Sequence, residues 1–191
     1  VKIKNTSNSV FNKISKAFPQ NIETKSFLKK LNVKNIHQIG NLKFTENYDE
    51  KLLRIRANLK KELSKKNIWV ASSTHEKEEL FCVNAHNYLK QRVRNLMTII
   101  IPRHTHRTRE IISEIEKLDL KVVLHSSKPS NLKNIDFYIV DTFGETKKFH
   151  KIACTVFIGG SIVRKGGQNP LEAARFGAKI LHGPYTDNFK D

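Results

Sequence analysis

The residue types best suited to chemistry lie in one glycine-rich stretch, residues 158–172. A short apolar run ends there at Gly159-Gly160, and a second pair, Gly166-Gly167, follows. Asn169 then precedes Pro170 at the start of an apolar helical pattern, where Asn favours the N-cap and Pro the first helical position. A strand, a glycine loop and a helix N-terminus together offer free N–H groups and a positive dipole end. The stretch therefore predicts an anion site, with a purely structural turn as the alternative.

Three further polar groups could act beside this stretch. Arg103 follows an apolar run, and its guanidinium could either hold a phosphate through two parallel hydrogen bonds or pair with a surface carboxylate. In residues 141–145, Gly144 lets backbone N–H groups face a phosphate and Glu145 could orient a base, unless the segment only starts a helix. Glu172 could accept hydrogen bonds from ribose hydroxyls, or simply complement the helix dipole.

Other kinds of site find little support. His104 and His106 alternate along a loop without a third ligand nearby, so we expect no metal site. No dinucleotide or Walker-type glycine loop occurs, no nucleophile–base set is convincing, and no cofactor is expected. Cys82 and Cys154 are far apart, and we interpret them as two reduced core thiols of a cytosolic protein.

Strands that alternate with helices must position these groups. Apolar runs such as Met97–Ile101 lack alternation, as in strands buried on both faces of a parallel sheet. The pattern predicts an α/β fold, a doubly wound and mostly parallel Rossmann-like sheet. In such sheets ligands bind beyond the carboxyl ends of the strands, which is where the polar groups above fall.

The net charge of +17, from 35 basic and 18 acidic residues, permits nucleic acid, an anionic membrane or a phosphorylated ligand as partner. The aromatic residues are not interleaved with basic ones as stacking platforms for nucleic acid would be. No apolar run approaches the roughly 18 residues needed to span a bilayer, and no signal peptide is visible. Both ends of the chain look cut from something larger.

Six motifs share the order and spacing of one known family, from about residue 20 to the end. They are Gly40–Phe44, Ala71–Glu76, Pro102–His104, Asp141–Glu145, Gly159–Ser161 and Gly166–Glu172. Together they resemble the 3-deoxy-D-manno-octulosonic acid (Kdo) transferases of Gram-negative bacteria.

The resemblance implies a GT-B glycosyltransferase that transfers Kdo from CMP-Kdo to a lipid A precursor in lipopolysaccharide biosynthesis. It implies that residues 46–191 are the CMP-Kdo-binding Rossmann-like domain, truncated at its C-terminus. Residues 1–45 would be a remnant of the acceptor-binding N-terminal domain and the inter-domain segment. The implied setting is the cytoplasmic face of the inner membrane, reached through the absent N-terminal part, with its anionic surface as a partner and no nucleic acid.

The resemblance also implies which residues contact the donor. Arg103 and the helix N-termini would hold the phosphate, Glu172 the ribose, and Gly144 with Glu145 the nucleotide. The full set is Pro102, Arg103, Phe143, Gly144, Glu145, Asn169, Pro170, Leu171 and Glu172.

Two positions depart from the family, which usually has Met at Phe143 and His at Gln168. Gln cannot carry a positive charge, so we expect weaker binding of the donor phosphate. The family's catalytic base is a Glu of the N-terminal domain, so no catalytic residue is expected here and the chain alone should be inactive. The alternatives are another GT-B sugar-nucleotide enzyme, such as a UDP-sugar transferase or epimerase, and a non-catalytic basic nucleic-acid-binding domain.

Overall fold

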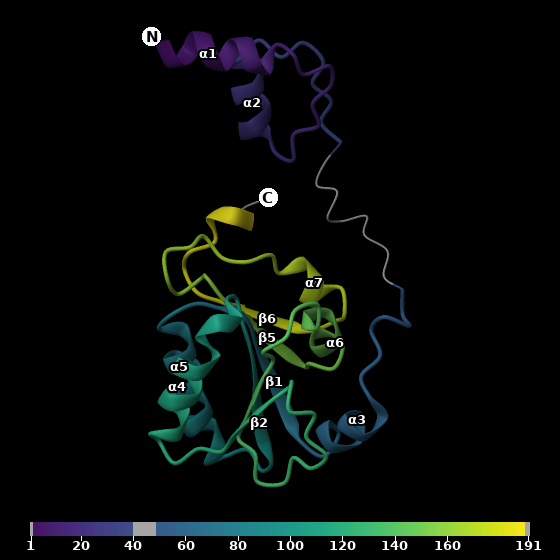
Figure 1. Cartoon of the computed structure of the whole chain (residues 1–191), viewed down its shortest axis with the longest axis vertical. Coiled ribbons are helices and arrows are strands. Elements are labelled where there is room, and N and C mark those ends of the chain that lie inside the picture. The colour runs from purple at the N-terminus through teal and green to yellow at the C-terminus, as the bar shows by residue number, and fades with distance from the viewer. Residues whose placement is uncertain (1, 40–48, 190–191) are drawn as a thin grey trace. The chain divides into compact units, whose positions relative to one another are not determined.

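The computed structural model of the chain describes residues 2–39 and 49–189 (Figure 1). The chain divides into two compact units, residues 1–48 and residues 49–190. The boundary predicted between residues 45 and 46 lies outside the described residues and stays a prediction, as does the Gly40–Phe44 motif. Within the described ranges, no helix has the length and hydropathy needed to cross a bilayer.

The first unit contains two short helices, α1 (Lys2–Phe11) and α2 (Ile22–Lys30). Asn21 caps α2, because its side chain accepts a hydrogen bond from the Thr24 N–H at 2.8 Å. The sequence from Ile36 to Ile39 predicts a short strand, but the structure has only one parallel bridge there, Ala17 to Ile36. The segment after Ala17 soon reaches Pro19, which has no N–H to extend a ladder.

The second unit contains a six-stranded parallel sheet, ordered β3-β4-β2-β1-β5-β6. Its strands are β1 (Asn67–Thr74), β2 (Leu96–Pro102), β3 (Val122–Leu124), β4 (Phe137–Ile139), β5 (Thr155–Ile158) and β6 (Lys179–His182). Every residue of the central strand β2 is buried, which explains its continuous apolar run. The predicted doubly wound parallel sheet is confirmed.

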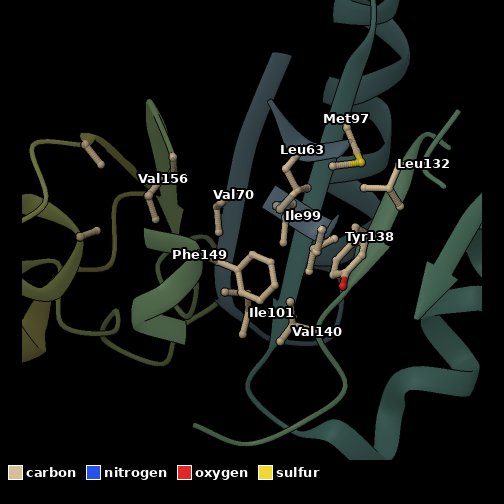
Figure 2. Close-up of a cluster of buried hydrophobic side chains, with 14 of the residues drawn as sticks. Leu63, Val70, Met97, Ile99, Ile101, Leu132, Tyr138, Val140, Phe149 and Val156 are labelled. Carbon is tan, nitrogen blue, oxygen red and sulfur yellow. The ribbon is translucent and has the colours of Figure 1, made fainter. Parts of the chain in front are cut away.

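Helices cover both faces of this sheet (Figure 1). On one face, α4 (Glu78–Lys90) and α5 (Thr108–Glu116) pack through side chains such as Val83 and Ile111. On the other lie α3 (Ala57–Leu63), α6 (Thr146–His150) and α7 (Leu171–Ala174). Figure 2 shows the core of this second face, where Phe149 of α6 lies among side chains from α3, β1, β2 and β4.

Two local predictions are wrong. The spacing of Leu52, Leu59 and Leu63 predicts a helix from about residue 49 to 65, but α3 begins only at Ala57. The Asp49 side chain accepts a hydrogen bond from the Lys51 N–H at 2.9 Å, a local turn that competes with the helix. The second error concerns the thiols: Cys82 is buried on α4, but Cys154 is exposed in the turn before β5.

Candidate functional site

The predicted polar groups gather at the carboxyl ends of the strands. Strands β1 and β2 lead to α4 and α5 on one face, whereas β4 and β5 lead to α6 and α7 on the other. Two pairs of neighbouring strands are therefore followed by helices on opposite faces of the sheet: β4 with β2, and β1 with β5. Crevices for ligands form at these switch points. Residues 141–145 and Arg103 lie at the first, and the glycine loop lies at the second.

The glycine loop after β5 is an anion site, but its anion is internal. The Glu78 carboxylate is fully buried and accepts the N–H groups of Gly160 at 2.7 Å, Ser161 at 3.0 Å and Ile162 at 2.9 Å. It also accepts the N–H of His75 at 3.0 Å. From the glycine pairs we expected a ligand in this cradle. That expectation is wrong for residues 160–162, because a side chain of the same chain already fills it.

Close packing explains the first glycine of the loop. A Cβ at Gly159 would lie 2.2 Å from the backbone oxygen of Ser73, so the end of β1 and the loop approach too closely for any other residue. Gly160 adopts φ +69°, which glycine accepts without strain.

The helix start after the loop is close to the prediction. The Asn169 side chain accepts a hydrogen bond from the Leu171 N–H at 3.0 Å, but Pro170 holds the N-cap position, so the cap predicted at Asn169 is wrong by one residue. Helix α7 begins at Leu171, one residue later than predicted, and Pro170 precedes it. Glu172 lies half-buried in the first turn, and no hydrogen bond or ion pair among the described residues engages its carboxylate. That carboxylate is available to a ligand.

Arg103 also keeps its side chain available. Pro102 ends β2 and is buried, and the Arg103 N–H donates to the Thr74 oxygen at 2.9 Å, which ties this position to the end of β1. Its guanidinium is exposed and has no ion pair among the described residues.

The segment after β4 places Glu145 in a small polar pocket. Gly144 adopts φ +81° and Phe143 is 83% exposed. The Glu145 carboxylate contacts Lys148 Nζ at 2.9 Å and His125 Nε2 at 3.6 Å. The segment thus presents one exposed aromatic ring and one carboxylate that is already engaged.

The same pocket contains side chains that the sequence analysis missed. Its volume is about 190 Å³, and Arg54 and Arg56 line it together with Glu145 and Phe149. His125 Nδ1 lies 2.7 Å from the hydroxyl of Tyr138, and burial lowers the pKa of His125, which keeps the ring neutral at pH 7. These residues come from distant segments, and no local pattern marks them.

Glu78 was also missed as a site element, although the sequence carries a signal for it. It follows His75 by three residues, the spacing at which a Glu near a helix start can accept the backbone N–H of the earlier residue. The two residues bond reciprocally, because the Glu78 N–H donates to the His75 oxygen at 3.0 Å.

A larger cavity, about 970 Å³, lies elsewhere. It is lined by residues of α4 and of strands β1, β5 and β6, mainly through apolar side chains such as Trp69, Phe81 and Leu181. None of the predicted donor-contact residues lines it. Within the described ranges no three His, Cys, Asp or Glu side chains converge as metal ligands.

Known proteins with similar sequences and folds identify the family that this chain resembles. The 3-deoxy-D-manno-octulosonic acid transferase of Haemophilus influenzae is 31% identical over 154 residues, 80% of this chain and 36% of that protein. The transferase of the same description from Rickettsia prowazekii is 36% identical over 157 residues, 81% of this chain and 33% of that protein. No family model matches the chain.

A solved structure adds the fold. The C-terminal CMP-Kdo binding domain of WaaA from Acinetobacter baumannii superimposes with a TM-score of 0.64 at 25% identity. The match covers 74% of this chain and 75% of that one. This chain is homologous to the C-terminal part of Kdo transferases. It spans about a third of the length of the Kdo transferases it matches. The resemblance predicted from the motifs, and the Rossmann-like GT-B fold it implied, are confirmed.

Proposed function

We propose that this chain is the donor-binding half of a Kdo transferase and binds CMP-Kdo. The observation that carries the proposal is the match in sequence and fold to a solved CMP-Kdo binding domain. It is supported by two unengaged groups, the Arg103 guanidinium and the Glu172 carboxylate, at the carboxyl ends of a parallel sheet.

The proposed donor contacts divide by chemistry. Arg103 holds the phosphate and stabilises the charge that develops on the departing CMP. Glu172 accepts from the ribose hydroxyls. The N–H groups of residues 160–162 already donate to Glu78, so they are not available to the phosphate. Arg103 and the turn that starts α7 bind the phosphate instead. Asn169, Pro170 and Leu171 form that turn.

Residues 143–145 contact the cytosine base of the nucleotide. The exposed ring of Phe143 offers a stacking surface, and Gly144 lets the backbone approach a ring edge. Pro102 shapes the start of the Arg103 turn. Because Lys148 and His125 already contact Glu145, its carboxylate acts on the nucleotide from a fixed position.

The complete reaction transfers Kdo to a lipid A precursor, with a general base from the N-terminal domain. A net charge of +17 would attract the chain to anionic lipid headgroups. We therefore propose that the protein acts at the cytoplasmic face of the inner membrane. A UDP-sugar enzyme or a nucleic-acid-binding domain is less well supported, since the matched relatives are Kdo transferases.

Calorimetric titration of the 1–191 chain with CMP tests the donor site. Arg103→Ala and Glu172→Ala should each weaken binding about tenfold or more, the loss expected for a hydrogen bond to a charged group. Arg109→Ala and Glu116→Ala, exposed positions on α5, are matched controls that should bind like the wild type. Equal affinities for all five proteins would contradict the assignment.

A further inference from the structure

Glu78 lies at the start of α4 and joins the ends of β1 and β5. Its Oε2 accepts from Gly160 and His75, and its Oε1 accepts from Ser161 and Ile162, with a longer contact of 3.5 Å from Val163. Successive backbone N–H groups that converge on one anion form a nest, a common binding geometry for phosphate. Here the nest is permanently occupied by a side chain.

The loop depends on this carboxylate for its shape. Gly160 adopts φ +69°, and the N–H groups of residues 160–162 turn inward to the carboxylate instead of pairing in a ladder. Without Glu78 these donors would lose their acceptor, and leaving inward-facing polar groups unpaired is costly. A loop without that acceptor would take another conformation or exchange among several.

Backbone hydrogen bonds connect the loop to the residues just before α7. The Gly167 N–H donates to the Gly160 oxygen at 2.8 Å, and the Gln168 N–H donates to the Gly159 oxygen at 3.0 Å. Asn169 follows at once, and Glu172 stands three residues later. The orientation of the proposed ribose and phosphate contacts is thus set by the loop that Glu78 holds.

The Glu78 carboxylate is also connected to the turn that carries Arg103. It accepts the N–H of His75, next to Thr74, whose oxygen accepts the Arg103 N–H. One buried side chain therefore braces both the Arg103 turn and the loop before Asn169.

We propose that Glu78 is a positioning residue of the donor site, which sets the loop geometry needed for nucleotide binding without touching the nucleotide. This inference rests on the proposed function for its binding consequence. Its structural part, the dependence of residues 160–163 on one carboxylate, can be measured without any ligand.

The neighbouring Glu79 provides a matched control. It is equally buried, at 1% exposed, and lies in the same helical turn. Its carboxylate pairs with Arg107 at 3.0 Å and makes no hydrogen bond with the glycine loop. Glu79→Gln thus removes a buried charge from α4 but leaves the loop's acceptor in place.

The experiment compares Glu78→Gln and Glu79→Gln in the 1–191 chain, at a temperature where circular dichroism shows both folded. Hydrogen exchange at residues 160–163 and calorimetric CMP affinity are measured. We expect Glu78→Gln to speed exchange at these amides and to weaken CMP binding, each about tenfold or more. Glu79→Gln should keep both within about twofold even if its melting temperature falls.

The two possible failures remain distinct. If the wild type does not bind CMP, the proposed function is wrong, and the exchange comparison alone decides whether Glu78 fixes the loop. Wild-type exchange and CMP affinity in Glu78→Gln, or equal losses in the two variants, would overturn the positioning role. If Glu78→Gln does not fold, Glu78→Asp, which keeps the charge but shortens the reach, replaces it in the same comparison.

Discussion

The Glu78 carboxylate accepts the backbone N–H of Gly160 at 2.7 Å, although the two residues are 82 positions apart. This contact places an internal anion where a glycine-rich loop would otherwise offer its N–H groups to a ligand. It separates the structural role of the loop from the proposed chemistry, which falls to Arg103 and Glu172.

Gly159 should tolerate no side chain. Gly159→Ala would put a Cβ 2.2 Å from the Ser73 oxygen, so the free energy of unfolding should fall by at least about 3 kcal/mol. Gly177→Ala is the control: its φ of +78° is strained for alanine, but no atom lies within 4 Å, and we expect a loss of about 1–2 kcal/mol. Urea unfolding measures both. A loss for Gly159→Ala no larger than that for Gly177→Ala would contradict the close approach, because Gly159 does not adopt a positive φ.

Stability should fall on mild acidification, because His150 is buried in its neutral form. His150 is 2% exposed, its Nε2 lies 2.9 Å from the hydroxyl of Ser72, and burial lowers its pKa from 6.5 to about 4. The unfolded chain takes up a proton near pH 6.5, but the folded chain does so only near pH 4. Protons therefore favour unfolding in this window, by up to about 3 kcal/mol from this one group.

The comparison of wild type with His150→Gln isolates this effect. Burial also lowers the pKa of His75, His86 and His125, so these groups contribute with the same sign and remain in both proteins. Urea unfolding at pH 7, 5.5 and 4.5 should show a smaller loss for the variant. Parallel losses in the two proteins would mean that His150 titrates normally in the folded state.

Kdo transfer should require the other half of the enzyme. With CMP-Kdo and a lipid A precursor, the 1–191 chain alone should give no detectable product, because the proposed general base belongs to the N-terminal domain. Adding an N-terminal half from a related transferase is expected to restore transfer, and the same mixture with Arg103→Ala should remain weaker. Robust turnover by the chain alone would refute the division of labour between the halves.

Local patterns explain which features could be predicted from the sequence. The continuous apolar run Met97–Ile101 predicted a strand buried on both faces, and the Asn169-Pro170 pair predicted the helix start to within one residue. Both depend on residues that are neighbours in the chain. The position of Arg103 at the end of β2 followed from the same strand prediction.

Features built by distant contacts could not be predicted. The occupant of the glycine loop is supplied by a residue 82 positions earlier, and the pocket around Glu145 combines Arg56 and His125 from separate segments. The late start of α3 follows a local turn over residues 49–54, in which the Asp49 side chain and the carbonyl groups of residues 49–51 accept hydrogen bonds. The charge of a residue or the periodicity of its neighbours does not indicate which distant residue it contacts in the fold.

The most direct test of the donor-site proposal is a competitive calorimetric titration of the 1–191 chain with CMP and with UMP. We predict saturable binding of CMP with a stoichiometry of one, and affinity for UMP weaker by about tenfold or more, since the two bases present opposite hydrogen-bonding edges. Failure of CMP to bind, or equal affinity for both nucleotides, would contradict the assignment of this chain as a CMP-Kdo donor domain.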